Sequence, residues 1–232
     1  MKTLIIFDID GTLLYSNKAD SRCFADSYEC VFGRVFPSTD WRKYPHVTDH
    51  TIFGTVFREH FQRDFLPEEM HTFQTDFVER MQRLRKENPA EFREVPGAKR
   101  TLERLTADEN YGVGIATGGW QKPAQFKLRH LGINYDGMYD GYADNAVTRE
   151  DIIRRALDKT EKYGYQRVVY VGDAIWDVRT TRNMSLPFVG IRRRGDYEVL
   201  TKAGAQCILQ DYSDYDAFLE AVKEAKVPRA SG

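Results

Sequence analysis

Two aspartates, Asp8 and Asp10, stand at the end of the short apolar run Leu4–Phe7, just before Gly11. In an extended chain, side chains two positions apart point the same way, so both carboxylates should converge on one site where the glycine ends the strand. Two like charges about 4 Å apart repel each other by about 4 kcal/mol at a protein-like dielectric constant. A buried pair of this kind requires a bound cation or a shared proton. The pair therefore predicts a functional site, in which the two carboxylates take part in a reaction or bind a cation.

Two later apolar runs also end in polar groups. The run 113–116 leads into Thr117-Gly118-Gly119, which offers a hydroxyl and backbone amides that an anion can approach closely. The run 168–171 leads to Asp173, and Asp177 follows one helical turn later. Each of these residues alone could be an ordinary turn or loop residue, because Asp, Gly and Thr are common there. Because the carboxyl ends of parallel strands meet at one edge of a sheet, we expect one pocket with the composition of a magnesium–phosphate site.

The elements that must position these residues alternate between strand and helix after residue 96. We expect strands at residues 3–8, 113–116, 138–142, 168–171, 188–191 and 207–209. We expect helices at residues 97–105, 123–131, 149–163, 178–184 and 215–226. Continuously apolar strands separated by helices predict a parallel sheet covered on both faces. Right-handed crossovers then give a doubly wound α/β layer.

Residues 16–91 follow a different pattern. Apolar residues recur at helical spacing over 19–32, over 48–61 and from Pro67 onwards, with no strand pattern between them. We therefore expect an inserted all-helical domain at 16–91, between the two pieces of one α/β domain at 1–15 and 92–232.

The composition excludes several other classes of protein. The 232 residues are 41% hydrophobic, which is ample for a core, and 34 Lys and Arg against 35 Asp and Glu leave a net charge of −1. With this balance of charges, the protein as a whole has no positive electrostatic field that would attract nucleic acid or anionic lipid. The sequence shows no apolar stretch near the ~18 residues of a membrane span and no signal-peptide pattern, and its three cysteines read as reduced thiols. We expect a cytoplasmic monomer or homodimer that binds neither nucleic acid nor membrane.

The same residues resemble the motifs of the haloacid dehalogenase (HAD) superfamily. Asp8–Leu13 matches the first motif of that family, Gly114–Gly118 resembles the second, and Gly172–Asp177 matches the fourth in content and spacing. The three motifs occur in the right order over nearly the whole chain. The resemblance implies a Rossmann-like HAD core with a C1-type helical cap, as in the capped phosphatase branch that includes phosphoglycolate phosphatases and β-phosphoglucomutases.

The resemblance also implies a role for each motif residue. Asp8 would be the nucleophile that forms an aspartyl-phosphate, Asp10 the general acid and base, and Thr117 a phosphate anchor with the amides of Gly118 and Gly119 beside it. Mg²⁺ would be the cofactor, held by Asp8, Asp10, Asp173 and Asp177. The acid at position 10 disfavours dehalogenation and phosphonate cleavage, because neither reaction has a phosphate-ester leaving group to protonate.

One family feature is missing from this chain. The family usually places a lysine before the fourth motif, often at the start of a helix, whereas the matching segment Asp144–Asp151 contains none. We infer that Arg149 takes this role, since a guanidinium also grips oxyanions, although it is bulkier. The alternatives are that Arg149 is a surface residue in a first helical turn, or that Lys122 or Lys127 supplies the charge.

The substrate contacts expected from the helical segment are His46, Thr48 and Asp49, which stand where related capped phosphatases often have a Gly-x-Thr-Asp turn, with His46 in place of the glycine. The alternative is that Thr48 and Asp49 only cap the following helix. Farther along, Arg192–Gly195 follows a strand, and it either attracts a phosphorylated substrate or is a solvated loop.

These observations lead to three functional hypotheses. The favoured one is a Mg²⁺-dependent phosphatase that hydrolyses a small phosphorylated metabolite through an aspartyl-phosphate. The second is a phosphosugar mutase of the same family, in which closure of the cap excludes water. The third, motivated by the missing lysine, is a phosphate-binding or regulatory protein with weak or no turnover.

Overall fold

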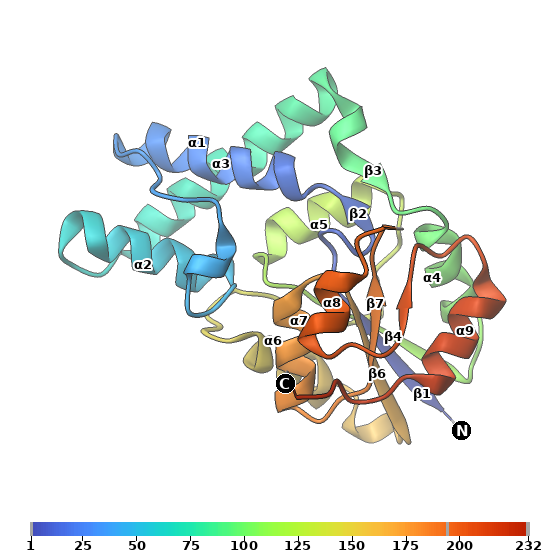
Figure 1. The fold of residues 1–232 in the computed structure, drawn as a ribbon. Helices are drawn as coiled ribbons and strands as arrows, with labels where there is room; N and C mark the ends of the chain where they lie inside the picture. Colours follow the sequence, from blue (N-terminus) through green and yellow to red (C-terminus); the bar gives the residue numbers. More distant parts are fainter. Residues whose placement is uncertain (1, 194, 231–232) are drawn as a thin grey trace.

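The computed structural model describes residues 2–193 and 195–230, and it contains a six-stranded parallel sheet in the order β5-β4-β1-β6-β7-β8 (Figure 1). The strands are β1 (Thr3–Phe7), β4 (Tyr111–Ala116), β5 (Tyr139–Gly141), β6 (Arg167–Gly172), β7 (Phe188–Ile191) and β8 (Ile208–Leu209). Because β1 pairs with β4 on one side and with β6 on the other, the three strand ends expected to carry the site are neighbours. The predicted α/β class with a doubly wound parallel sheet is confirmed.

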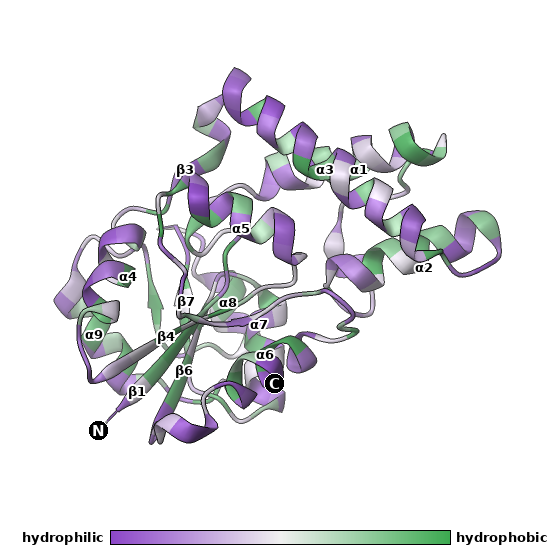
Figure 2. Ribbon diagram, turned by 180° about the vertical axis from the view of Figure 1, so that it is seen from behind, coloured by the Kyte–Doolittle hydropathy of each residue, from purple (hydrophilic) through white to green (hydrophobic). Residues whose placement is uncertain are grey.

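The central strand shows why the sheet is covered on both faces. Leu4 and Ile6 of β1 belong to one buried apolar cluster, while Ile5 and Phe7 belong to another. The surrounding helices are α4 (Ala98–Thr106), α5 (Gln121–His130), α6 (Arg149–Asp158), α7 (Ile175–Asn183), α8 (Glu198–Ala203) and α9 (Tyr215–Glu224). Figure 2 shows the largely hydrophobic central strands between helices in which many residues are hydrophilic. No helix of the described residues is long and apolar enough to cross a membrane.

Most predicted elements are present within a few residues of their expected bounds, and the clearest differences concern two helices and the shortest elements. The helix predicted at 149–163 ends at Asp158, where the Thr160 hydroxyl donates a hydrogen bond of 2.6 Å to the carbonyl of Leu157, and a separate 3₁₀ turn follows. The helix predicted at 178–184 already begins at Ile175, so Asp177 lies in its first turn. Helix α8 and the short antiparallel ribbon of β2 and β3 were not predicted, because such short elements give no periodic pattern.

Three helices lie between the two strands of that ribbon, β2 (Leu14–Tyr15) and β3 (Arg93–Glu94). They are α1 (Asn17–Phe32), α2 (Asp49–Phe61) and α3 (Pro67–Glu87). The Phe73 ring at their centre lies 4.9 Å from the rings of Phe24 and Phe53 and 5.7 Å from that of Trp120, which follows β4. This aromatic cluster joins the helical segment to the carboxyl edge of the sheet. The division into 1–15, 16–91 and 92–232 stays a prediction.

The fully buried Phe73 side chain should be a main support of this cluster. Phe73→Ala should lower the free energy of unfolding by about 3–5 kcal/mol, because it leaves a cavity among the rings. Chemical denaturation measures this change. Thr75→Ala, on the exposed side of the same helix, is the control and should stay within about 0.5 kcal/mol of the parent. A Phe73→Ala protein as stable as the parent would contradict this packing role.

Candidate active site

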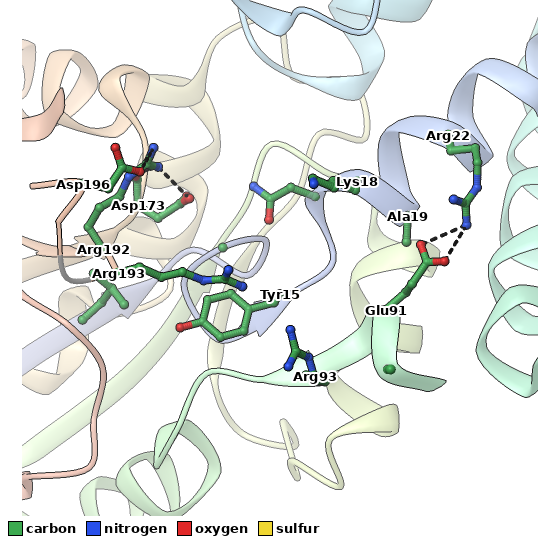
Figure 3. A pocket seen from close by; sticks show the side chains of 14 residues that line it. Tyr15, Lys18, Ala19, Arg22, Glu91, Arg93, Asp173, Arg192, Arg193 and Asp196 are labelled. Carbon is green, nitrogen blue, oxygen red and sulfur yellow. Dashed lines mark hydrogen bonds and ion pairs between the residues drawn. The ribbon is translucent and has the colours of Figure 1, made fainter. Parts of the chain in front are cut away.

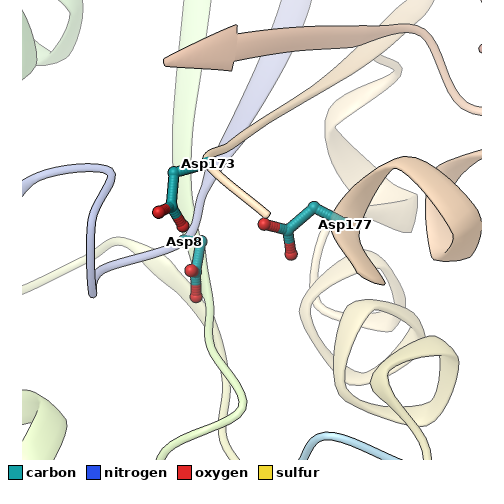
Figure 4. Close-up of side chains that lie close together, drawn as sticks. All are labelled: Asp8, Asp173 and Asp177. Atoms are coloured by element: carbon teal, nitrogen blue, oxygen red, sulfur yellow. The ribbon is translucent and has the colours of Figure 1, made fainter. Parts of the chain in front are cut away.

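Three buried carboxylates meet at the carboxyl edge of the sheet. Asp8 follows β1, Asp173 follows β6, and Asp177 lies in the first turn of α7. One oxygen of each carboxylate lies within 4.8 Å of the others (Figure 4). The backbone fixes two of them, since the Asp8 amide donates to the Val171 carbonyl at 2.9 Å and Asp177 Oδ2 accepts from the Ala174 amide at 3.0 Å. The structure therefore brings together three of the four predicted metal ligands.

Arg149 supplies a positive charge to this group. Its Nη2 lies 2.6 Å from Asp177 Oδ1 and 3.3 Å from Asp8 Oδ1. The same nitrogen donates to the Tyr170 hydroxyl at 3.0 Å, and that hydroxyl donates to the Ala116 carbonyl at 2.8 Å. Although Arg149 is the first residue of α6, its side chain is buried. The alternative of a surface arginine is therefore wrong.

Burial makes these carboxylates costly to ionise. It raises the pKa of Asp8 from 3.8 to about 7, against the opposing charge of Arg149. Burial also raises the pKa of Asp173 well above its usual value, and it raises the pKa of Asp177 despite Arg149. Arg149, together with the partly exposed Arg192 at 3.6 Å from Asp173, thus does not offset the burial of three carboxylates, and the group favours a further cation or bound protons.

The shape of the group fits a hard divalent cation. Asp8 Oδ1 is buried and forms no hydrogen bond in the described structure. Gly11 has a φ of 81°, and a Cβ at this position would overlap the Asp173 carboxylate, so only glycine lets the loop pass so close. Carboxylate oxygens are the ligands that Mg²⁺ and Ca²⁺ prefer. The three aspartates could therefore hold a metal ion.

Asp10 lies outside this group and has a different cation. Lys127 of α5 places its Nζ 2.7 Å from Asp10 Oδ2 and also forms an ion pair with Asp20 of α1. The Ser16 hydroxyl donates to the other Asp10 oxygen. Burial alone would lower the pKa of Lys127, but the two carboxylates outweigh it and raise that pKa, so the side chain stays charged. Of the two fallback lysines, Lys127 reaches the site, whereas Lys122 is exposed and forms no ion pair within the described residues.

Asp20 was missed by the sequence reasoning. It stands four residues before Phe24, on the apolar side of α1. An acidic residue on the buried stripe of a helix is a signal that could have marked it. Burial raises the pKa of Asp20 to about 6, against the opposing charge of Lys127.

The loop after β4 meets the start of α2. Thr117 is buried, and the Gly118 carbonyl accepts a hydrogen bond of 2.7 Å from the Asp49 amide. Asp49 Oδ2 in turn accepts from the Trp120 amide at 3.0 Å, and burial raises the pKa of Asp49 well above its usual value. A Cβ on Gly118 would lie 2.6 Å from the Val47 carbonyl oxygen, so this close contact needs a glycine.

Of the three predicted substrate contacts in residues 46–49, one lines the cavity and one caps a helix. Thr48 caps α2, since its Oγ1 accepts from the Thr51 amide at 3.2 Å. Asp49 lines the small cavity above Asp8, whereas His46 is exposed and does not line it. That cavity of about 70 Å³ is also lined by Asp10, Thr117, Gly118, Gly119 and Arg149.

The family is decided by a match over most of the chain. The model of the haloacid dehalogenase-like hydrolase family matches residues 5–191, which include every motif residue of this site. The chain belongs to this family. This HAD-like hydrolase is accordingly an enzyme.

Known relatives agree with this assignment. The phosphoglycolate phosphatase of Agrobacterium fabrum (strain C58) is 27% identical over 197 residues, which cover 82% of this HAD-like hydrolase and 81% of that protein. A hydrolase from Pseudomonas syringae has a TM-score of 0.71 at 22% identity, covering 95% of this chain and 99% of that one. CbbY from Rhodobacter sphaeroides, solved in complex with phosphate, has a TM-score of 0.65 at 19% identity, covering 92% and 96%. The two structural likenesses support the fold.

The raised carboxyl pKa values should make the cation-free HAD-like hydrolase less stable as the pH rises from about 4 to about 7. In the unfolded chain an aspartate ionises near pH 4, whereas folding raises the pKa of Asp8 to about 7 and that of Asp20 to about 6. The stabilisation by such protonated groups is fully present below the unfolded pKa and is lost as the pH rises through the folded one. In EDTA, the free energy of unfolding should fall between about pH 4 and pH 7, by at most about 1.4 kcal/mol per pH unit for each group.

Chemical denaturation in EDTA across this pH range measures the slope. Asp8→Asn should flatten it, while Asp136→Asn, at an exposed position away from the site, should keep it. A parent protein whose stability rises from pH 4 to pH 7 would contradict this electrostatic description.

Proposed function

We propose that this HAD-like hydrolase is a Mg²⁺-dependent phosphatase that hydrolyses a small phosphomonoester through an aspartyl-phosphate on Asp8. The observation that carries the proposal is the environment of Asp8, a buried carboxylate between Arg149 and the acidic pair Asp173 and Asp177. The cavity above it is lined by Thr117, Gly118 and Gly119, whose hydroxyl and backbone amides suit an anion, although the Gly119 amide donates to Thr117 Oγ1 at 3.3 Å in this structure. The relationship to a phosphoglycolate phosphatase supports the same reaction class.

In the first step, the Asp8 carboxylate attacks phosphorus and the bond to the leaving oxygen breaks. Asp10 gives its proton to that oxygen, so the alcohol leaves neutral. Arg149, Thr117 and the glycine amides hold the phosphoryl oxygens, whose charge is spread over three atoms in the transition state. Asp8, Asp173 and Asp177 would hold Mg²⁺, which supplies further neutralisation of the phosphoryl charge when bound.

In the second step, water attacks the phosphorus of the aspartyl-phosphate. Asp10, now a carboxylate, takes a proton from this water, and the bond between Asp8 and phosphorus breaks to release inorganic phosphate. Lys127 and Ser16 hold the Asp10 carboxyl in place from two sides. Two separate cations thus serve two neighbouring aspartates, which suits a nucleophile and a proton carrier with different tasks.

A phosphosugar mutase is the second candidate, and the roof of the small cavity favours it. Trp41, Val47 and Ile52 from the helical segment line this cavity, and closure of these side chains over Asp8 would limit the access of water. Release of inorganic phosphate from a sugar phosphate supports the phosphatase, whereas isomerisation without release supports the mutase. The motive for a binding protein without turnover is weakened, since Arg149 supplies the charge that the missing lysine would have given.

The proposed reaction predicts Mg²⁺-dependent hydrolysis of p-nitrophenyl phosphate. EDTA should abolish it, and Asp8→Asn should lower kcat by about 1,000-fold or more because the nucleophile is lost. Asp173→Asn should raise the Mg²⁺ concentration needed for half-maximal rate. Asp136→Asn, at an exposed position, is the matched control and should behave as the parent. An Asp8→Asn enzyme with parental activity would contradict the proposed nucleophile.

The role of Asp10 predicts a dependence on the leaving group. Asp10→Asn should lower kcat/KM for alkyl phosphates by about 100-fold or more, because an alkoxide needs a proton to leave. The loss for p-nitrophenyl phosphate should be far smaller, since nitrophenolate leaves without one. Lys127→Met should show the same selectivity, because Lys127 positions Asp10.

Lys122→Met, on the exposed side of the same helix, is the control and should change neither ester. Thermal melting checks that Lys127→Met remains folded. An equal loss for both esters in Asp10→Asn would rule out its role as the acid.

A further inference from the structure

The cavity above Asp8 is too small for a whole metabolite. Its volume is about 70 Å³, whereas ligand pockets usually begin at about 300 Å³. A second cavity of about 690 Å³ opens beside it, and Asn17 lines both. Gly11 and Asp173 also line the larger cavity, so it begins at the carboxylate group that could hold the metal. The larger cavity is therefore the nearest space for the rest of a substrate.

The larger cavity is rich in basic side chains (Figure 3). Its charged lining residues are the basic Lys18, Arg22, Arg93, Arg192 and Arg193 and the acidic Glu91, Asp173 and Asp196. Two of the basic residues have acidic partners: Arg22 lies 2.9 Å from Glu91, and Arg192 lies 2.7 Å from Asp196 and 3.6 Å from Asp173. Figure 3 shows these pairs at opposite sides of the cavity. They leave the middle of the cavity to the other three cations.

Those three, Lys18, Arg93 and Arg193, form no ion pair with any described residue. They come from separate elements, namely the start of α1, strand β3 and the loop after β7. The Arg193 guanidinium lies 4.3 Å from the centre of the Tyr15 ring, a cation–π contact that restrains its position. Water and salt screen these exposed cations from one another, but an anion placed among them is attracted by all three. Because the net charge of the whole chain is −1, this concentration of positive charge is a property of the cavity and not of the protein as a whole.

We propose that this larger cavity binds a second anionic group, a phosphate or a carboxylate, of the same substrate whose phosphoryl group reacts at Asp8. The inference rests on the proposed function and adds the substrate class, which is a phosphomonoester with a second anion at its other end. Lys18, Arg93 and Arg193 are the residues that recognise this anion. A substrate with a neutral end leaves these three cations unpaired, so the cavity discriminates against it.

Matched pairs of substrates test this class in the Mg²⁺-supplemented full chain. Fructose 1,6-bisphosphate against fructose 6-phosphate tests a second phosphate, and phosphoglycolate against ethyl phosphate tests a carboxylate. In at least one pair, the substrate with the second anion should have a kcat/KM about tenfold higher or more. p-Nitrophenyl phosphate, which has no second anion, gives the basal activity.

Variants of the exposed cations locate the effect. Arg93→Ala and Arg193→Ala should each raise KM for the preferred substrate by about tenfold and leave hydrolysis of p-nitrophenyl phosphate unchanged. Arg100→Ala, an exposed arginine outside the cavity, is the matched control and should change neither. Lys18→Ala provides an independent third variant on another element.

Two results overturn the inference while the proposed function stands. One is hydrolysis of p-nitrophenyl phosphate with no preference in either pair, and the other is an equal effect of Arg93→Ala on both members of the preferred pair. If no ester is hydrolysed, the proposed function fails. Calorimetric titration with fructose 1,6-bisphosphate and phosphoglycolate then tests whether the larger cavity binds an anion. Binding weakened by Arg93→Ala but not by Arg100→Ala supports the anion site, and absence of binding to both compounds overturns it.

Discussion

The repulsion among the buried carboxylates of Asp8, Asp173 and Asp177 is the constraint on which the rest of the site depends. Like charges at about 4 Å cost about 4 kcal/mol per pair even at a moderate dielectric constant, so three of them within 4.8 Å need cations nearby. Arg149 touches two of the three, and burial still raises their pKa values against its charge. The carboxylates are close together because β1 lies next to β6 in the sheet. Gly11 adds to the crowding, because it lets its loop pass directly against the Asp173 carboxylate.

A second cation separates the roles of two aspartates that are close in sequence. Asp8 faces Arg149, whereas Asp10 faces Lys127, and both cations come from helices that follow strands of the sheet. Lys127 also forms an ion pair with Asp20 in the helical segment, so the environment of Asp10 depends on the position of α1 relative to α5. The electrostatic problem of the Asp8–Asp10 pair is thus met by two buried cations and, in the proposed mechanism, by a metal ion.

Much of the core could be predicted, because a buried strand followed by a polar residue is a local pattern. The strand at 188–191 was predicted with its observed bounds, and Asp8, Asp173 and Asp177 meet because strand ends share one edge of a parallel sheet. The family match and the parallel sheet confirm the fold class and the resemblance on which the motif roles were based.

The contacts that depend on tertiary packing could not be predicted. Asp20 and Lys127 lie on helices far apart in the sequence, and only the packed structure brings them together. Lys18 and Arg93 look like ordinary solvated charges in the sequence, and attraction of a phosphorylated substrate was considered there only for the loop that holds Arg193. The common cavity of the three forms only when the ribbon of β2 and β3 lies near the loop after β7. His46 stands in place of the glycine of a family pattern and is exposed, whereas the close contact with Gly118 is made by Val47 and Asp49.

The central claim is that Arg149 does the work for which the family usually has a lysine, by neutralising Asp8 and the phosphoryl group together. The most direct test compares kcat/KM for p-nitrophenyl phosphate in Arg149→Lys and Arg149→Met at saturating Mg²⁺, with thermal melting to confirm folding. Arg149→Lys should keep measurable turnover, while Arg149→Met should lose about 100-fold or more because the charge at the phosphoryl group is gone. A folded Arg149→Met enzyme with parental kcat/KM would contradict it.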